Sequence, residues 1–250
     1  MNKNPKKLIP VVFLIFINTA AGLFAAGPDA YRNGTPDPLI RRMPDSIRSL
    51  RTRGAEEYLQ KVAEYIAENA VDEFDKVKKA HDWVALNIRY NARAFFSGNI
   101  PSQSVSNVLS SGLAVCQGYA EVFYYICKLL DLECYIVHGY ARGYGRNLTR
   151  KETPHRVNHA WNKVKIEGNW YLVDTTWDSG YVANNNFVAR YKTSYLFPDP
   201  WHFLHDHFPT NPEDQLLTVP LTAEQFEKLP LVEPEFFSFV FELTQICLYQ

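Results

Sequence analysis

The chain has 250 residues, 46% of them hydrophobic, so it is long enough to bury the core of one large domain. Its 26 lysines and arginines nearly balance 27 aspartates and glutamates, which excludes an acidic solvating protein and argues against a mainly electrostatic nucleic-acid binder. Four cysteines are too few for a small scaffold held together by disulfides.

The N-terminus has the pattern of an export signal. Three lysines precede an apolar run at residues 8–17, and small residues follow as far as Ala26. A charged start, a short apolar centre and a small-residue end are typical of a cleavable signal peptide. The run is about half of the ~20 residues that cross a bilayer, which disfavours the alternative of a retained anchor. We expect residues 1–26 to be removed, no stable membrane span afterwards, and a secreted or periplasmic, cell-envelope location.

A proline-rich stretch and two helices follow. Residues 27–45 contain four prolines, which break both helices and strands, so we expect a linker there. The apolar stripe that begins with Leu59, Val62 and Ile66 has the spacing of an amphipathic helix. Residues 74–88 repeat that spacing, and Asp72 can cap this second helix.

The middle of the chain changes from helix to strand signals. After a polar segment at residues 97–112, a third helix is expected, and an exposed polar loop lies between two of the later strands. Helices first and antiparallel strands second indicate an α+β fold. The expected elements are the third helix at 115–130, strands at 134–140, 160–166 and 170–176, the loop at 142–158, and a turn at Gly168 and Asn169.

Cys116 is the strongest candidate for a catalytic residue. It lies in the first turn of the third predicted helix, after a glycine-containing loop. The unpaired amides and the positive dipole end of a helix N-terminus favour the thiolate, which is the nucleophilic form. The alternative for Cys116 alone is a buried structural cysteine.

His159 and Asp174 lie on adjacent predicted strands joined by a tight turn near Gly168. Such a hairpin places its distal residues side by side, although these two positions are out of register by a few residues, which a bulge or longer turn would absorb. A carboxylate beside an imidazole fixes the tautomer and supports the imidazolium. The three residues together suggest a Cys–His–Asp arrangement for covalent acyl transfer.

At these residues the sequence resembles the transglutaminase-like superfamily. The resemblance rests on three motifs in order: Cys-x-Gly-Tyr at Cys116, His-Ala-Trp at His159, and Asp-Thr-Thr-Trp-Asp at Asp174. The block YLFPDPWHFLHDHFPTNPEDQLL is similar to the segment after the triad in kyphoscoliosis peptidase-like proteins. The resemblance extends over roughly residues 55–220.

The resemblance implies a papain-like, transglutaminase-like α+β core with N-terminal helices, a catalytic helix and an antiparallel sheet. It also implies that Cys116 is the nucleophile, His159 the general base and acid, and Asp174 the orienting carboxylate. We therefore divide the chain into a signal peptide (1–26), a linker (27–45), a catalytic domain (46–219) and a C-terminal tail (220–250). The tail either packs on the main domain or begins a further module.

Other residues near the motifs are weaker candidates. The Cys116 backbone amide is expected to donate to an oxyanion, and Gln103 is the side chain suggested as a second donor. Trp161 and Trp177 are expected to pack around the triad, with a substrate wall as the alternative. His155 and Asp178 are either substrate contacts or exposed loop residues.

The remaining histidines and cysteines could bind a metal or have structural roles. The histidines and aspartate of residues 201–207 are crowded enough to suggest zinc, but a packed aromatic loop is favoured, and we expect no metal and no cofactor. His81 falls on the second helix stripe and is read as a hydrogen-bonded core histidine. Cys127, Cys134 and Cys247 are bystanders, with a 127–134 disulfide and free buried thiols both open.

We interpret the chain as an exported cysteine peptidase or acyltransferase that acts on protein or peptide substrates and binds no nucleic acid. A transglutaminase or deamidase would use the same triad, because the acceptor that reaches the thioester decides the product. The alternatives from other classes are a non-catalytic binding module of the same fold and a cell-envelope structural protein.

Overall fold

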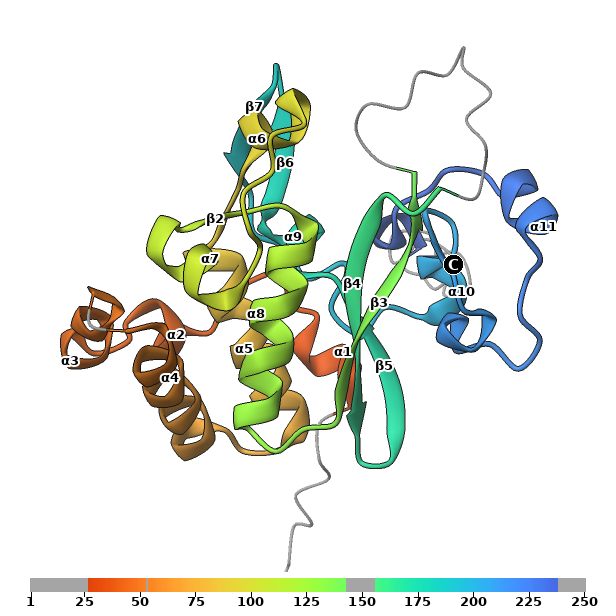
Figure 1. Cartoon of the computed structure of the whole chain (residues 1–250). Helices are drawn as coiled ribbons and strands as arrows, with labels where there is room; N and C mark the ends of the chain where they lie inside the picture. Colours follow the sequence, from red (N-terminus) through yellow and green to blue (C-terminus); the bar gives the residue numbers. More distant parts are fainter. Residues whose placement is uncertain (1–26, 53, 143–155, 238–250) are drawn as a thin grey trace, which may run out of the picture.

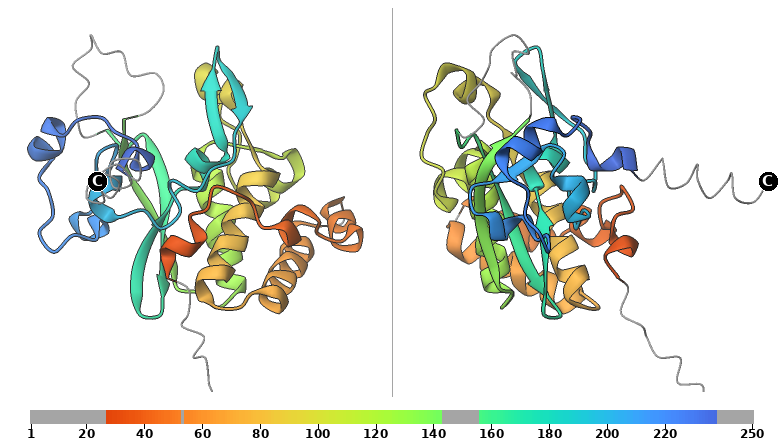
Figure 2. Two further views of the ribbon diagram at one scale, coloured as in Figure 1. Left: turned by 180° about the vertical axis from the view of Figure 1, so that it is seen from behind. Right: turned by 90° about the vertical axis from the view of Figure 1, so that its right-hand side faces the viewer.

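Helices and a sheet form two sides of the molecule. The computed structural model describes residues 27–52, 54–142 and 156–237. Three long helices, α4 (Ala55–Asn69), α5 (Glu73–Asn87) and α8 (Cys116–Leu129), pack beside a four-stranded antiparallel sheet (Figure 1). The segment after residue 200 lies on the other side of this sheet (Figure 2). The predicted α+β fold, with N-terminal helices, a central helix and an antiparallel sheet, is confirmed.

Short elements complete the described chain. The helices and helical turns are α1 (Pro28–Tyr31), α2 (Pro38–Arg41), α3 (Asp45–Arg48), η1 (Ser49–Thr52), α6 (Ala92–Ser97), α7 (Val105–Ser111), α9 (Thr175–Ser179), α10 (Pro200–Phe203), η2 (Pro212–Gln215) and α11 (Ala223–Lys228). The strands are β1 (Arg89–Tyr90), β2 (Leu113–Ala114), β3 (Cys134–Ala141), β4 (His159–Ile166), β5 (Asn169–Val173), β6 (Gly180–Ala183), β7 (Asn186–Ala189) and β8 (His207–Pro209).

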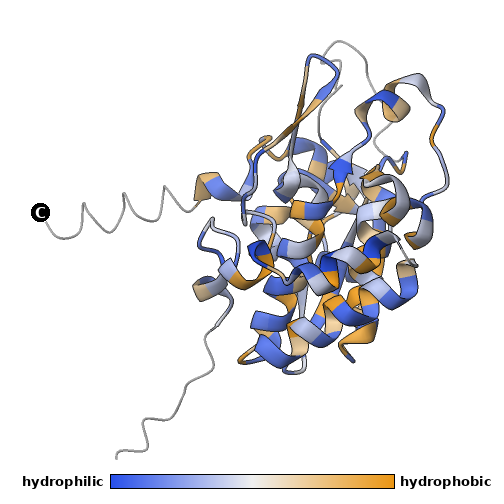
Figure 3. Ribbon diagram, turned by 90° about the vertical axis from the view of Figure 1, so that its left-hand side faces the viewer, coloured by the Kyte–Doolittle hydropathy of each residue, from blue (hydrophilic) through white to orange (hydrophobic). Residues whose placement is uncertain are grey.

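The two predicted helix stripes form most of the larger core. Leu59, Val62 and Ile66 of α4 are fully buried, and the inner face of α5 packs with them. Asp72 caps α5 as expected, because its Oδ1 accepts the Asp75 amide at 2.8 Å. Apolar and polar residues alternate along the helices in Figure 3, as an amphipathic pattern requires.

The central sheet has the order β5–β4–β3–β8, with every pair antiparallel. A two-residue turn joins β4 to β5, and both of its residues have positive φ: 49° at Glu167 and 85° at Gly168. Such a turn matches the twist of the strands it connects. The predicted turn at Gly168 and Asn169 is therefore wrong by one residue, since Asn169 already pairs with Ile166.

The third predicted strand is shorter than expected. β5 ends at Val173, and residues 175–179 form helix α9 instead of continuing the strand. The cause is Asp174, whose Oδ1 accepts the amides of Thr176 at 2.8 Å and Trp177 at 3.2 Å. An aspartate that bonds the next two amides starts a helix and competes with strand pairing.

The stretch predicted as a linker packs against the domain. Residues 28–48 form three short helices, and the Ile40 and Met43 side chains are buried in the larger core. The Asp37 amide also donates to Asp82 Oδ2 at 2.7 Å, which anchors this stretch to α5. The prolines at helix starts are tolerated because the first helical amides need no partner. The polar segment 97–112 likewise contains a helix, α7.

The described part of the C-terminal tail also packs on the main domain. Phe226 of α11 is fully buried against Tyr140 and lies under the Arg142 guanidinium, 3.9 Å from its ring centre. The same guanidinium donates to the carbonyl of Leu229 at 2.7 Å and to that of Phe226. The described tail therefore packs on β3 and β8, through the contacts of Phe226 with Tyr140 and Phe208.

Several expectations fall on other parts of the chain. The predicted signal peptide at 1–26, most of the 142–158 loop with His155, and Cys247 lie outside the described residues. Among the residues that are described, no helix is both long and apolar enough to cross a membrane.

His81 is the centre of a buried polar cluster between α5 and α9. Its Nδ1 lies 3.0 Å from Asp82 Oδ1, and its Nε2 lies 3.0 Å from Asp178 Oδ2. Lys78 and the Tyr191 hydroxyl also contact Asp82, each at 2.5 Å. His81 is thus the hydrogen-bonded core histidine that was predicted, whereas Asp178 is buried and lies neither in an exposed loop nor at a surface.

Replacing His81 with leucine is expected to lower the free energy of unfolding by about 3 kcal/mol, because Asp82 and Asp178 would stay buried without their shared partner. Urea denaturation measures this loss as a lower midpoint. The control is K61A, which breaks the exposed Lys61–Glu64 pair and should leave the midpoint unchanged. Equal midpoints for H81L and K61A would contradict a stabilising role for the cluster.

Candidate active site

Cys116 is the first residue of α8, as the sequence predicted. Its amide therefore has no acceptor within the helix and points toward the space in front of the helix N-terminus. Two residues on, Gly118 allows neighbouring segments to approach, because a Cβ there would lie 2.7 Å from Ala114 Cβ and 2.8 Å from Val108 Cγ2. The Cys116 side chain is half-buried at this crowded end of the helix.

The register of the β4–β5 hairpin brings His159 and Asp174 together without a bulge. Asn162 pairs with Val173, so position 174 lies opposite position 161. His159 is two residues from position 161 and therefore projects from the same face of the sheet, diagonally across from Asp174. His159 Nε2 lies 2.7 Å from Asp174 Oδ2. The expected pairing is present, and the expected bulge is not needed.

Asp174 is a fully buried carboxylate that is saturated with donors. Oδ1 accepts the two α9 amides, and Oδ2 faces His159. Burial raises the pKa of Asp174, but the charge and hydrogen bond of His159 hold it far below its usual range, with a further contribution from a second histidine, His207. Asp174 is therefore a permanent anion behind His159.

Cys116 and His159 perturb one another's pKa. Burial raises the pKa of the Cys116 thiol, but the charge and hydrogen bond of His159, with the Ala160 amide, lower it below its ordinary value. Burial opposes the charged form of His159, yet Asp174 and then Cys116 raise the pKa of His159 to about 10. These shifts favour a thiolate–imidazolium pair near neutral pH. Since Nε2 is bonded to Asp174, Nδ1 is the nitrogen available to the sulfur.

His207 and Asp206 are the residues that sequence reasoning missed. His207 Nε2 lies 3.2 Å from Asp174 Oδ2, and its Nδ1 lies 2.5 Å from Asp206 Oδ1. The sequence interpretation placed both residues in a packed aromatic loop. The only local signal was the crowding of histidines and aspartate at 202–207, and nothing in it indicated that β8 pairs with β3 and so reaches Asp174.

His159, Asp174 and His207 are the described residues that could hold a metal ion, because one ligand atom from each lies within 4.8 Å of the others. The arrangement fits hydrogen bonding better. Both Nε2 atoms already face the same Asp174 oxygen, and His207 Nδ1 is bonded to Asp206. A metal bound to either Nε2 atom would replace the proton that bonds Asp174, so we derive no metal chemistry at this site.

The weaker candidates lie at different distances from this cluster. Trp161 is buried beneath it, with ring centroids 5.9 Å from His159 and 5.1 Å from His207, so it packs as expected. Trp177 is half-buried, and its ring centroid lies 5.5 Å from that of His159.

Gln103 lies beside the start of α8. Its Oε1 accepts the Val115 amide at 2.9 Å, and its Nε2 donates to the Pro101 carbonyl at 2.8 Å. Its role as an oxyanion donor stays a prediction.

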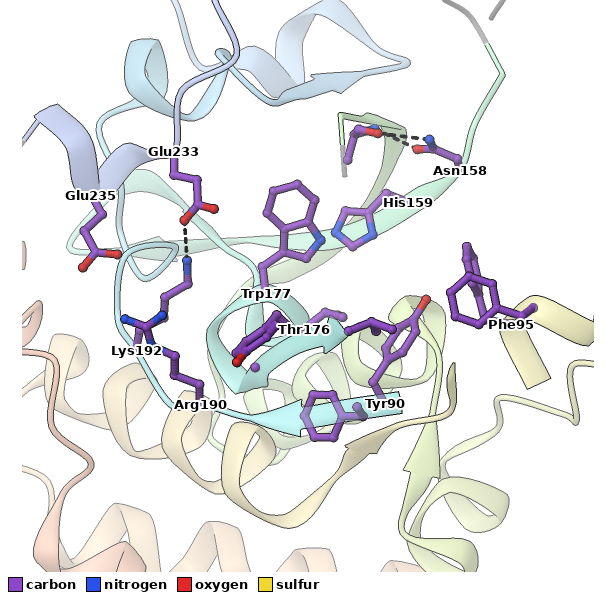
Figure 4. Close-up of a pocket in the computed structure, with 16 residues that line it drawn as sticks. Tyr90, Phe95, Asn158, His159, Thr176, Trp177, Arg190, Lys192, Glu233 and Glu235 are labelled. Atoms are coloured by element: carbon purple, nitrogen blue, oxygen red, sulfur yellow. Dashed lines mark hydrogen bonds and ion pairs between the residues drawn. The ribbon is translucent and has the colours of Figure 1, made fainter. Parts of the chain in front are cut away.

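A cavity of about 440 Å³ opens at His159 and Trp177 (Figure 4). In Figure 4 the aromatic residues Tyr90 and Phe95 lie on one side of it, and the labelled charged residues lie on the other, where Lys192 bonds Glu233 at 2.8 Å. The aromatic residues are Tyr90, Phe95, Phe96, Tyr181 and Phe187; the charged ones are Arg190, Lys192, Glu233 and Glu235. Two of the lining residues, His159 and Tyr90, feel the charge of Cys116: burial and then that charge raise the pKa of Tyr90. The arrangement suits an extended ligand bound beside His159.

The other described cysteines differ from Cys116. Cys127 of α8 and Cys134 of β3 are both buried and reduced. Burial, followed by a hydrogen bond to Cys134, raises the pKa of Cys127 well above its ordinary value. A buried thiol that holds its proton is a poor nucleophile. The pKa of Cys116, by contrast, is lowered.

Comparison with known proteins places this site in a family. Residues 60–175 match the family model described as the transglutaminase-like superfamily. The chain contains a transglutaminase-like domain. The matched range includes α8, the β4–β5 hairpin and Asp174, so it contains the Cys116 and His159 motifs and the start of the Asp174 motif.

Relatives of the transglutaminase-like domain are longer proteins. Kyphoscoliosis peptidase of Mus musculus is 31% identical over 182 residues, which are 72% of this chain and 27% of that protein. A LIM and transglutaminase domain protein of Caenorhabditis elegans is 24% identical over 70% of this chain and 25% of its own length. A crystal structure of a TGase superposes with a TM-score of 0.40 and 22% identity, covering 53% of this chain and 33% of that one. The chain spans about a quarter of the length of the mouse and Caenorhabditis elegans relatives.

Proposed function

We propose that this chain is an exported cysteine enzyme that transfers acyl groups at amide bonds of proteins or peptides and acts as a peptidase. The observation that carries the proposal is the placing of Cys116 at the start of α8 together with His159, whose Nε2 lies 2.7 Å from the buried Asp174 Oδ2. The lowered pKa of the Cys116 thiol and the raised pKa of the His159 imidazole agree with it. The mouse relative is named a peptidase, which supports hydrolysis as the outcome.

The proposed acylation step uses Cys116, His159 and Asp174. The Cys116 thiolate attacks the amide carbonyl carbon, and the oxygen gains a negative charge that the Cys116 amide can stabilise. His159 donates its Nδ1 proton to the leaving nitrogen, the C–N bond breaks, and an acyl thioester remains on sulfur. Asp174 holds the ring through Nε2 throughout.

Deacylation decides the product. Neutral His159 takes a proton from water, the hydroxide attacks the thioester carbonyl, and the C–S bond breaks to return the thiolate. If an amine reaches the thioester instead, the same step forms a new amide bond. We assign the chain to hydrolysis, with cross-linking and deamidation as the products that would reassign it.

Export is part of the proposal. The charged, apolar and small-residue sequence of residues 1–26 supports a signal peptide and therefore a secreted or cell-envelope location. N-terminal sequencing of the protein purified from the culture medium or envelope tests this. A mature N-terminus within the first few residues after Ala26 is expected, and an N-terminus at Met1 would contradict cleavage.

The protonation state of Cys116 can be measured without a substrate. We expect iodoacetamide to alkylate Cys116 well below the pH at which ordinary thiols react, because the His159 imidazolium stabilises the thiolate. Above about pH 10 His159 loses its proton, so alkylation should persist while peptide turnover falls for want of the acid that protonates the leaving amine. Mass spectrometry of each cysteine peptide across pH gives the profile.

Cys127 and Cys134 are the internal controls of that measurement, because both are buried. If Cys116 reacts no faster than they do below pH 8, the enzyme proposal fails. A reactive Cys116 in a protein that neither cleaves nor cross-links any member of a peptide library would instead favour the non-catalytic binding module. Isopeptide products formed with an added primary amine would reassign the chain to cross-linking.

A further inference from the structure

A chain of hydrogen bonds continues beyond the predicted triad. Asp174 Oδ2 faces both His159 Nε2 at 2.7 Å and His207 Nε2 at 3.2 Å. His207 Nδ1 lies 2.5 Å from Asp206 Oδ1, and the Tyr195 hydroxyl donates to Asp206 Oδ2 at 2.6 Å. Asp174, Asp206 and His207 are each 0% exposed. The proposed mechanism uses none of the groups beyond Asp174.

The far end of this chain is fixed by the sheet. His207 opens β8, where it pairs with Ala141 at the end of β3. The Asp206 carbonyl accepts the Arg142 amide at 2.8 Å, so the backbone on both sides of the pair is anchored. Phe203 stacks on the His207 ring with centroids 4.1 Å apart. The imidazole therefore cannot turn without breaking several contacts.

His207 lies between two carboxylates, and each of its ring nitrogens faces a carboxylate oxygen. Its hydrogen bond and its charge help to hold the pKa of Asp174 low. Besides Asp174 and Asp206, the titratable groups that face the His207 ring are His159 and Tyr195, with ring centroids 5.3 and 5.4 Å away. The rings of Trp161, Trp177 and Phe203 also pack against it.

We propose that His207, held by Asp206, is a positioning residue that fixes Asp174 and balances part of its charge, and so adjusts the Cys116–His159 pair. This inference rests on the proposed function, since it assigns His207 to the site in which Cys116 is the nucleophile. Two imidazoles then share one carboxylate oxygen. His159 exchanges protons with substrate, whereas His207 keeps its protons and acts only through Asp174.

Replacing His207 should shift the pKa values of Cys116 and His159 in a direction that can be worked out. Replacing the His207 cation with a neutral side chain makes the surroundings of Asp174 more negative by one charge. An added negative charge opposes thiolate formation and favours the imidazolium, so the pKa values of Cys116 and His159 should both rise. A purely structural role for His207 would lower the amount of folded protein without moving either value.

The test is the pH profile of Cys116 alkylation in the full chain carrying His207→Gln. Glutamine is neutral and can keep one donor toward Asp174. We expect the acid limb of the profile to move upward by about one pH unit, so that alkylation below that limb slows about tenfold. Peptide turnover should lose about 10- to 100-fold in kcat with little change in KM, the usual effect of removing a residue that orients a catalytic ligand.

His205→Gln is the matched control. His205 is a buried histidine two residues away, but its Nδ1 faces the Pro230 carbonyl at 3.0 Å and it does not contact Asp174. We expect its profile to match that of the native chain. If H207Q does not fold, Asp206→Asn replaces it, because His207 then loses the carboxylate that holds its second proton. A smaller upward shift is expected in that variant.

The outcomes separate this inference from the proposed function. A folded H207Q protein with an unchanged alkylation profile overturns the positioning role, whatever the turnover of the native chain. Equal shifts in H207Q and H205Q would also overturn it, because they would show a general disturbance of the segment. A native chain with a reactive Cys116 but no turnover would overturn the proposed function alone.

Discussion

Replacing Cys116 with alanine is expected to abolish peptide turnover while leaving the fold intact. The substitution removes the only atom that attacks the carbonyl in the proposed mechanism, so a loss of about 10⁵-fold or more is expected. Cys116 is half-buried, and alanine keeps its Cβ, so little packing is lost. Fragment release measured by mass spectrometry, with circular dichroism of the same sample, checks both statements.

Cys134→Ala provides the matched control for that variant. Cys134 is buried at the start of β3, where its sulfur lies 3.9 Å from Asn162 Nδ2, away from His159. Its removal should leave turnover near the native rate. Native-like turnover by C116A would refute Cys116 as the nucleophile, and an equal loss in C134A would assign the effect to damaged packing.

The second large effect is expected from Asp174→Asn. Asparagine keeps an oxygen for the Thr176 and Trp177 amides, so the cap of α9 survives. Its Nδ2 can only donate, so His159 Nε2 must accept, and the ring proton moves to Nδ1. A neutral ring protonated on Nδ1 cannot take the proton of the Cys116 thiol. We expect kcat to fall about 10⁴-fold, as when the orienting carboxylate of a catalytic histidine is lost.

Asp178→Asn separates this loss from a general effect of neutralising a buried carboxylate. Asp178 lies four residues further along and is equally buried, but it bonds His81 rather than His159. D178N should lower the urea midpoint while the turnover of the folded fraction stays near the native rate. The Asp174 assignment is wrong if the two variants lose the same turnover, or if D174N still forms the Cys116 thiolate at the native pH.

Features that depend on neighbouring residues were predictable from the sequence. The stripes of α4 and α5 were identified because burial of a helix repeats every three to four residues. Cys116 was predicted at a helix N-terminus because the same apolar spacing marks the extent of α8. The β4–β5 hairpin was recognised, but its turn was displaced by one residue and β5 was extended past Asp174. Both errors arise where a single side chain or backbone angle overrides a strand pattern.

The tertiary structure decided how distant segments meet. His207 reaches Asp174 because β8 pairs with β3, some 66 residues earlier in the chain, and no local pattern encodes that pairing. Burial of the proline-rich stretch through Ile40 and Met43 likewise depends on the surface that α5 offers. The cavity combines side chains from distant parts of the chain, including Tyr90 and Glu233 of the tail.

The sequence alone therefore determined a single core with nearly balanced charge, one cysteine at a helix start, and a histidine and an aspartate on one hairpin. These follow from composition and short-range periodicity, which act over a few residues. Only the tertiary structure decided that one thiol has a lowered pKa while Cys127 keeps its proton, and that Asp174 is shared by two histidines. Those properties depend on burial and on charges brought together from distant segments.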